Sequence, residues 1–347
     1  MKVTIKEIAK LAGVHRSTVD KVLHNREGVS DEVRQNIQKL IKETGYEPNP
    51  VGRILQQQSR QYRIAAVMVD VDALPYLKQG LEDGLKAWKS FNISFSFYVT
   101  KFDDVHRQCE ILNQLIEDQV DGIILSPVNT PEVGAMIDRA ADAGIPVVTT
   151  NSDVPESKRL CNVGQNEERA SRIAGRMFSM MLGGRGKAAI VTSTIAAQNN
   201  NYYTKLRERV FSEYIRENHP DITIERLIEC QEDYQLTYER TLEMLRECPD
   251  LNGIYITCGG ASEVGRALCQ TGKQHQIHVV SFEDYPEIIS LLQEEVIDCT
   301  ISSELSRQGS LPVEVLMNYL AYQKKPEHTV MYTDTRIFVK ESVSAVS

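Results

Sequence analysis

The 347-residue sequence offers little that would support catalysis, a metal site or a membrane location. Its seven cysteines are odd in number and lack a Cys-x-x-Cys pair, which favours reduced, partly buried thiols over disulfides or zinc. No Gly-x-Ser-x-Gly elbow or Walker loop is present, and no apolar run is long enough to cross a bilayer. We therefore expect a protein that is not an enzyme, with no catalytic residue, metal, cofactor or membrane contact.

Charge is unevenly distributed along the chain. Residues 1–60 hold eleven Lys and Arg against seven Asp and Glu, whereas the remainder holds 28 against 41. A net charge of about +4 is thus joined to one of about −13, so only the N-terminal part suits a polyanion. The first three residues run straight into a predicted helix and leave no room for a secretory signal, so we expect a cytoplasmic location.

The N-terminal segment has the pattern of three short helices around one small core. Thr4 followed by Glu7 predicts a capping box, and Gly13 ends the first helix. A second helix is expected from about Arg16 to His24, with valines on its inner face. Ser30 suits the cap of a third helix, which ends at Gly45.

The second helix has the features of a recognition helix. Arg16, Ser17 and Lys21 lie near its N-terminus, and a tight glycine turn precedes it. In the major groove, arginine or lysine donates to guanine, while serine bonds either bases or phosphate. The alternative is that these residues only solvate an ordinary helix.

This segment resembles the lactose-repressor/galactose-repressor (LacI/GalR) family. The residues that carry the resemblance are Thr4–Val14, Ser17–Val19, Val22–Asn25, Gly28–Ser30 and Gly45–Pro50. The resemblance implies that Arg16, Ser17 and Lys21 face bases. It implies that phosphate contacts, or the loops that make them, come from Thr4, His15, Thr18, Asn25 and Ser30, and it adds Asn49 to the DNA-binding set. His15, Asp20 and Gly52 depart from the family pattern, and Asp20 leaves the outer operator sequence open because phosphate repels a carboxylate.

Residues 50–55 match the family's hinge, a short helix that enters the minor groove as a symmetric pair. The resemblance makes Leu55 the apolar wedge that unstacks a central base step. Gly52 costs a helix about 1 kcal/mol relative to alanine, so we expect this helix to fold only on DNA. The alternative is a plain linker. The predicted domains are a helix-turn-helix head at 1–48, hinge and linker at 49–61, and a two-lobed domain at 62–347.

The remainder alternates short apolar runs with helical patterns, which indicates parallel βαβ units. The predicted strands are Ile64–Val69, Ile93–Val99, Gly122–Leu125, Ile145–Thr149, Ala188–Thr192, Ile254–Thr257 and Ile277–Phe282. Ligands of such sheets bind at the carboxyl ends of the strands, where the loops here are polar. From these loops we predict Asp72, Tyr76 and Asn129 as ligand contacts.

This part resembles the periplasmic sugar-binding, ribose-binding-like fold, in which two lobes close on a ligand. The resembling stretches are Asp121–Val128, Gly144–Val148, Asn151–Asp153, Val163–Gly164, Ala174–Arg176 and Gln308–Gly309. The resemblance carries ligand contacts onto Asn151, Arg207 and Glu283. Gly259 and Ser303 fall at ligand positions but differ from the residues of ribose binders, so pentose specificity does not transfer.

Structural roles stay open for these candidates. Asn151 and Asp153 could form an Asx turn, and Arg207 could pair on the surface with Glu208 or Glu239. Glu283 and Asp284 could cap the helix that begins near Pro286.

The expected fold is therefore a small all-α helix-turn-helix head joined to an α/β two-lobed domain with parallel sheets. The expected function is a DNA-binding transcriptional regulator, a repressor, that acts as a homodimer on a pseudo-palindromic operator. A small polar effector, a sugar or sugar derivative bound between the lobes, would control its affinity. The alternative is a solute-binding protein of a transport system with an unrelated N-terminal extension.

Overall fold

The computed structural model describes residues 4–23, 26–44, 60–193, 202–231 and 233–343. The chain forms two compact units. One comprises Met1–Gln61 and Ser90–Asn92, and the other, the sensor unit, comprises Tyr62–Lys89 and Ile93–Ser347. Within the described ranges, no helix is both long and apolar enough to span a membrane.

The head consists of α1 (Ile5–Ala12), α2 (Arg16–Leu23) and α3 (Asp31–Thr44). The predicted capping box forms, since the Glu7 amide donates to Thr4 Oγ1 at 3.4 Å and the Thr4 amide donates to Glu7 Oε2 at 2.7 Å. Gly13 ends α1 in the left-handed region, with φ of 65°. Ile8, Val19 and Ile37, one from each helix, are fully buried. The prediction of three short helices around one core is confirmed.

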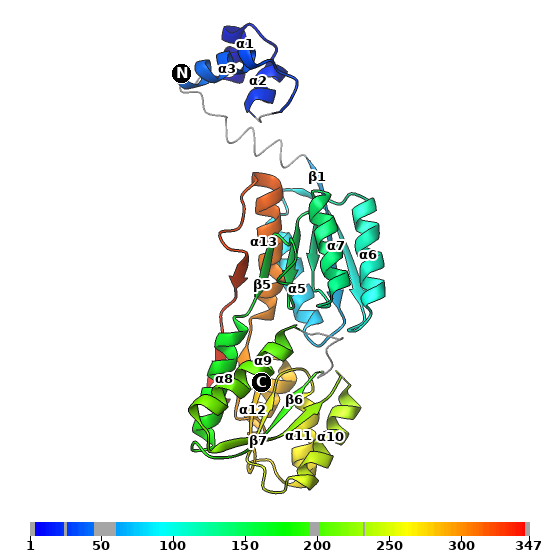
Figure 1. Ribbon diagram of the computed structural model, residues 1–347, viewed down its shortest axis with the longest axis vertical. Coiled ribbons are helices and arrows are strands. Elements are labelled where there is room, and N and C mark those ends of the chain that lie inside the picture. The colour runs from blue at the N-terminus through cyan, green and yellow to red at the C-terminus, as the bar shows by residue number, and fades with distance from the viewer. Residues whose placement is uncertain (1–3, 24–25, 45–59, 194–201, 232, 344–347) are drawn as a thin grey trace. The chain divides into compact units, whose positions relative to one another are not determined.

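The sensor unit contains two six-stranded sheets, one in each lobe (Figure 1). The first lobe has the strand order β11-β5-β4-β3-β1-β2, and the second has β12-β10-β9-β8-β6-β7. The first-lobe strands are β1 (Gln61–Val69), β2 (Asn92–Thr100), β3 (Gly122–Leu125), β4 (Val147–Thr150), β5 (Cys161–Gly164) and β11 (Val330–Tyr332). The second-lobe strands are β6 (Gly186–Thr192), β7 (Ile222–Glu229), β8 (Gly253–Ile256), β9 (His278–Phe282), β10 (Cys299–Ser302) and β12 (Arg336–Phe338).

Helices cover these sheets. Those of the first lobe are α5 (Leu74–Ala87), α6 (Val105–Glu117), α7 (Pro131–Asp142) and α13 (Leu305–Tyr322). Those of the second lobe are α8 (Glu167–Met181), α9 (Tyr202–Asn218), α10 (Tyr234–Glu247), α11 (Ala261–Thr271) and α12 (Pro286–Gln293), and a 3₁₀ turn spans Lys340–Ser342. Helices α5 and α13 pack with their backbones in close approach at Gly309. A Cβ atom at this position would lie 2.2 Å from the Leu77 carbonyl oxygen, which is too close for any side chain. Glycine is therefore required there.

The chain crosses between the lobes after β5, after β10 and between β11 and β12. Side chains tie these crossovers together. Gln165 Nε2 donates to the Ser302 carbonyl at 3.0 Å, and Thr333 Oγ1 donates to the Ser303 carbonyl at 2.7 Å. Each crossover thus bonds to another, so a change in the angle between the lobes must move all of them together.

The seven predicted strands are confirmed, with ends shifted by up to three residues. The largest shift is at β1, predicted from Ile64 and observed from Gln61. Pairing is parallel from β1 through β3, β4 and β5 to β11 and from β7 through β6, β8 and β9 to β10, whereas β12 runs antiparallel to β10. The pattern missed five strands because they are short, polar or at a sheet edge: β5, β7, β10, β11 and β12.

Candidate functional site

A cleft of about 630 Å³ lies between the two lobes of the sensor unit. Its walls come from the loops after β1, β4, β8 and β9 and from the first turns of α8, α9, α11 and α13, as expected for the carboxyl ends of parallel strands. The predicted residues that line it are Asp72, Tyr76, Asn151, Arg207, Gly259, Glu283 and Ser303. Asn129 does not line it, because the chain after β3 turns directly into the cap of α7 at Thr130.

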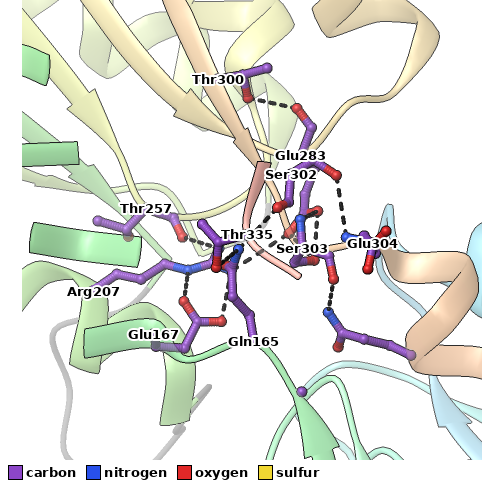
Figure 2. A network of polar contacts seen from close by, with 12 residues as sticks. Gln165, Glu167, Arg207, Thr257, Glu283, Thr300, Ser302, Ser303, Glu304 and Thr335 are labelled. Atoms are coloured by element: carbon purple, nitrogen blue, oxygen red, sulfur yellow. Dashed lines mark hydrogen bonds and ion pairs between the residues drawn. The ribbon is translucent and has the colours of Figure 1, made fainter. Parts of the chain in front are cut away.

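Arg207 lies at the centre of a buried polar network in the cleft wall (Figure 2). Its Nε donates to Glu167 Oε2 at 2.6 Å and its Nη2 donates to Glu167 Oε1 at 3.0 Å, a bidentate pair between α9 and α8. Nη1 donates to the Thr257 carbonyl at 3.1 Å. The guanidinium also lies over the Phe282 ring, 3.8 Å from its centroid. These contacts fix the orientation of the guanidinium.

A surface pairing of Arg207 with Glu208 or Glu239 is therefore wrong. Arg207 is 8% exposed and Glu167 is 3% exposed, so the ion pair is buried. Breaking a buried pair leaves an uncompensated charge in a medium of low polarity.

Glu283 is the second carboxylate of this network. Its Oε1 lies 3.5 Å from Arg207 Nη2, and its carboxylate accepts from Ser303 Oγ at 2.8 Å. Its backbone is left-handed, with φ of 72°, a conformation that is unfavourable for a long side chain. The capping alternative is wrong, because α12 has no side-chain cap and Asp284 Oδ1 accepts from Ser302 Oγ instead.

Two carboxylates thus share one guanidinium. Burial raises the pKa of Glu283 to about 7, against the opposing effects of Arg207 and Ser303. Burial likewise raises the pKa of Glu167, while Arg207 acts to lower it. The network therefore takes up a proton at a pH where an exposed carboxyl group is fully ionised.

This proton predicts a pH dependence of stability. A carboxyl group whose pKa rises on folding, here from 4.5 to about 7, stabilises the fold fully below pH 4.5 and loses that contribution as pH rises through 7. Between pH 5.5 and 8 we expect the unfolding free energy to fall by about 1 to 3 kcal/mol more in the wild type than in Glu283→Gln. Urea denaturation of both proteins across this range measures the difference, and parallel profiles would contradict it.

The other strand-end candidates have mixed roles. Asn151 lines the cleft in the left-handed region, with φ of 59°, which asparagine tolerates. Asp153 is buried and is paired with Arg159, whose Nε donates to its Oδ1 at 2.5 Å. Thr149 Oγ1 also donates to Asp153 at 2.8 Å. Asp153 is thus a structural residue, and an Asx turn does not explain it.

Aromatic side chains cross the cleft from lobe to lobe. Tyr76 of the first lobe stacks on Tyr285 of the second, with ring centroids 4.9 Å apart and planes 19° apart. The Tyr234 hydroxyl at the start of α10 donates to Asp72 after β1. Both contacts connect the two lobes across the cleft.

Glu167 and Gln308 are among the buried polar residues of the cleft that sequence reasoning missed. Each lies in the first turn of a helix directly after a crossover, whereas the prediction considered only strand ends. A search for polar residues in the first turn of the helix that follows each crossing between the lobes would have found both.

All seven cysteines are free, and the sulfur atoms of two of them lie close together. Cys230 Sγ lies 3.3 Å from Cys258 Sγ, and Cys258 lines the cleft. The two residues follow different strands, so a search for closely spaced cysteines could not find the pair. In the described part of the chain, no group of three or more His, Cys, Asp or Glu is placed to hold a metal ion.

The head presents its predicted base-reading residues to solvent. Arg16, Ser17 and Lys21 are exposed, while Val19 and Val22 of the same helix are buried in the core. Thr4, His15 and Ser30 are exposed, and Thr18 is half-buried. Asn25, Asn49 and Leu55 lie outside the described residues.

Both unusual head residues have local partners. His15 precedes α2, and its Nδ1 accepts from the Ser17 amide at 3.3 Å, so it serves as the cap that serine usually provides. Asp20 Oδ2 lies 3.8 Å from Arg26 Nη1. Arg26 thus offsets the charge that would otherwise repel a phosphate, a partner that the sequence analysis did not consider.

Two family models match this chain. The model described as periplasmic binding protein domain matches residues 64–325, and the model described as bacterial regulatory proteins, lacI family, matches residues 4–49. Among curated relatives, catabolite control protein A of Staphylococcus epidermidis is 32% identical over 157 residues, which cover 44% of this chain and 45% of the relative. The counterpart in Staphylococcus aureus strain MRSA252 is 29% identical over 183 residues, 51% of this chain and 53% of the relative. The matches thus span about half the length of these relatives.

Solved structures share the fold of the sensor unit. GanP, a glucose-galactose binding protein from Geobacillus stearothermophilus, has a TM-score of 0.74 and 24% identity, covering 82% of this chain and 99% of its own. A putative LacI transcriptional regulator from Bacteroides fragilis has a TM-score of 0.72 and 20% identity, covering 81% of this chain and 98% of its own. The chain belongs to the periplasmic binding protein domain family and carries the DNA-binding head of the lacI family of bacterial regulatory proteins.

Proposed function

We propose that this protein is a sequence-specific transcriptional regulator, a repressor, whose affinity for operator DNA is controlled by a small polar ligand in the cleft. The observation that carries the proposal is the presence in one chain of a lacI-type head with exposed Arg16 and Lys21 and of a two-lobed unit with a polar cleft. The family models point to a regulator and a binding protein. Such a protein acts where its operator is, in the cytoplasm.

The DNA partner in this proposal is a pseudo-palindromic operator bound by a homodimer. One eight-residue recognition helix reads too few bases to specify a site, whereas two related by a two-fold axis read two half-sites. Sedimentation of the full chain with and without operator tests the dimer, and a stable monomer under both conditions would contradict it.

A transport solute-binding protein is the competing proposal, supported by the fold shared with GanP. It leaves residues 4–49 without a role, although they match a DNA-binding family. Selection of bound duplexes from a random pool separates the two functions. A regulator enriches a two-fold-symmetric sequence, and a solute-binding protein enriches none.

The proposal predicts reciprocal coupling between the cleft and the operator. A ligand that changes operator affinity by a given factor must have its own affinity changed by the same factor, typically about 5- to 150-fold. The expected result is one coupling factor from two titrations, ligand affinity with and without operator and operator affinity with and without ligand. A ligand that binds in the cleft and leaves operator affinity unchanged would contradict the control mechanism.

A further inference from the structure

The charge lining the cleft is almost entirely negative. Among the described lining residues, the carboxylates are Asp70, Asp72, Glu167, Glu263, Glu283 and Glu287, and Arg207 is the one Lys or Arg. Arg207 is already engaged by Glu167, Glu283 and the Thr257 carbonyl. A phosphate or carboxylate entering this cleft would meet repulsion, and the described lining residues offer no free cation to offset it.

The buried charged groups among the described residues of the cleft are two carboxylates and one guanidinium, so when both carboxylates are ionised they carry one negative charge in excess. Glu167 and Glu283 are both at least nine-tenths buried, and the single guanidinium of Arg207 lies between them. Of the two, Glu283 is held less tightly, because its ion pair is 3.5 Å long while that of Glu167 is bidentate at 2.6 and 3.0 Å. A ligand cation beside Glu283 would neutralise the excess, as a proton does in its absence.

A neighbouring amide supplies an unused acceptor in the same wall. Gln308 is 2% exposed, lines the cleft and donates from Nε2 to the Ser303 carbonyl at 3.0 Å. A carbonyl can only accept, so this bond fixes which end of the amide faces Ser303. Gln308 Oε1 then has no hydrogen-bond partner among the described residues. A buried acceptor without a donor is costly, and a ligand N–H or O–H would relieve that cost.

Glu283 and Gln308 are linked through one residue. Ser303 donates to Glu283 from its hydroxyl and accepts from Gln308 at its carbonyl, so both acceptors belong to the same part of the wall. The Tyr76–Tyr285 pair provides an apolar face elsewhere in the cleft, on which a ring or a cation can pack.

We propose that the ligand carries a protonated amine on a small hydroxylated skeleton, the class of the amino sugars, with its ammonium at Glu283 and Gln308. The inference rests on the proposed function only in taking the cleft as the ligand site. The ammonium group would pair with the carboxylate of Glu283, and the hydroxyl groups would donate to the other acceptors of the cleft wall. A neutral sugar can make only the hydroxyl contacts. A sugar phosphate would be repelled by the carboxylates.

The test is isothermal titration of the full chain with matched pairs in which one hydroxyl replaces the ammonium. The pairs are glucosamine with glucose, galactosamine with galactose and mannosamine with mannose, and glucose 6-phosphate is the anionic probe. At least one amine should bind about tenfold or more tightly than its parent sugar, the effect expected of a charge-assisted hydrogen bond. Binding should also release protons near neutral pH, since the ammonium displaces the proton on Glu283.

Two variants localise the effect. Glu283→Gln should remove the preference for the amine and the proton release while still binding the parent sugar. Glu82→Gln, which removes an exposed carboxylate of α5 that does not line the cleft, should keep both.

Equal or tighter binding of the neutral parent, tighter binding of glucose 6-phosphate, or no binding of any of these amines at millimolar concentration would overturn the inference. Operator binding is measured separately. If a neutral sugar shifts operator affinity and no amine binds more tightly, the amino-sugar inference is wrong and the proposed function is supported. If the chain binds the amine but no operator, the inference is supported and the proposed function is wrong.

Discussion

Arg207→Ala is expected to lower the unfolding free energy of the sensor unit by about 3 to 5 kcal/mol near neutral pH and to abolish any ligand response. The guanidinium is the bidentate partner of Glu167, which is 3% exposed, and it also contacts Glu283. Its removal leaves two buried carboxylates without a cation. Because protonation relieves that repulsion, the deficit should shrink as pH falls toward 5.

A matched control lies two residues further along the same helix. Arg209 is exposed and pairs with Glu213 at 3.3 Å, so Arg209→Ala should cost at most about 0.5 kcal/mol. Urea denaturation of both variants gives the comparison. Where Arg207→Ala does not fold, Arg207→Lys retains the charge but not the bidentate fork, and it should fold with an intermediate loss. Equal effects of Arg207→Ala and Arg209→Ala would show that the pair is not the strong contact that its burial indicates.

How much of this site the sequence predicted depends on where each residue lies. Asp72, Tyr76, Arg207 and Glu283 were found because they follow recognisable strands or match a family position. Glu167 was missed because it pairs with Arg207 across 40 residues of sequence, and no local pattern reports such a contact. Asn129 was assigned to the cleft by the same rule that found Asp72, but the loop after β3 turns away into α7.

The same reasoning explains the errors in the fold. Strands buried on both faces, such as β3 and β8, are continuous apolar runs and were predicted within one residue. Strand β7 is an edge strand whose residues are mostly exposed, so it lacks the apolar run that indicates a buried strand. Strand β10 is half polar, because Thr300 and Ser302 of its Cys-Thr-Ile-Ser sequence are buried and bonded to the Glu283–Asp284 turn. Tertiary hydrogen bonds override the hydropathy pattern there.

On the head, Arg16→Ala is expected to weaken binding to the cognate operator by about 1 to 3 kcal/mol per half-site and to relax discrimination at one symmetric base pair. The reason is the orientation of α2. Val19 and Val22 are buried in the head core, and Arg16 on the same helix is exposed at its N-terminus. An arginine at that end of a recognition helix can bond guanine with two donors, and alanine retains neither.

A lost base contact must be distinguished from a lost charge. Lys39→Ala removes one positive charge from α3, where Lys39 lies 3.8 Å from Glu43 and is 73% exposed. Both variants should weaken binding to random duplex similarly, because that binding depends on charge. Only Arg16→Ala should reduce the ratio of operator to random-duplex affinity, measured by fluorescence anisotropy at one fixed salt concentration. If the ratio falls equally in both variants, Arg16 contacts the phosphate backbone, and base reading passes to Ser17 and Lys21.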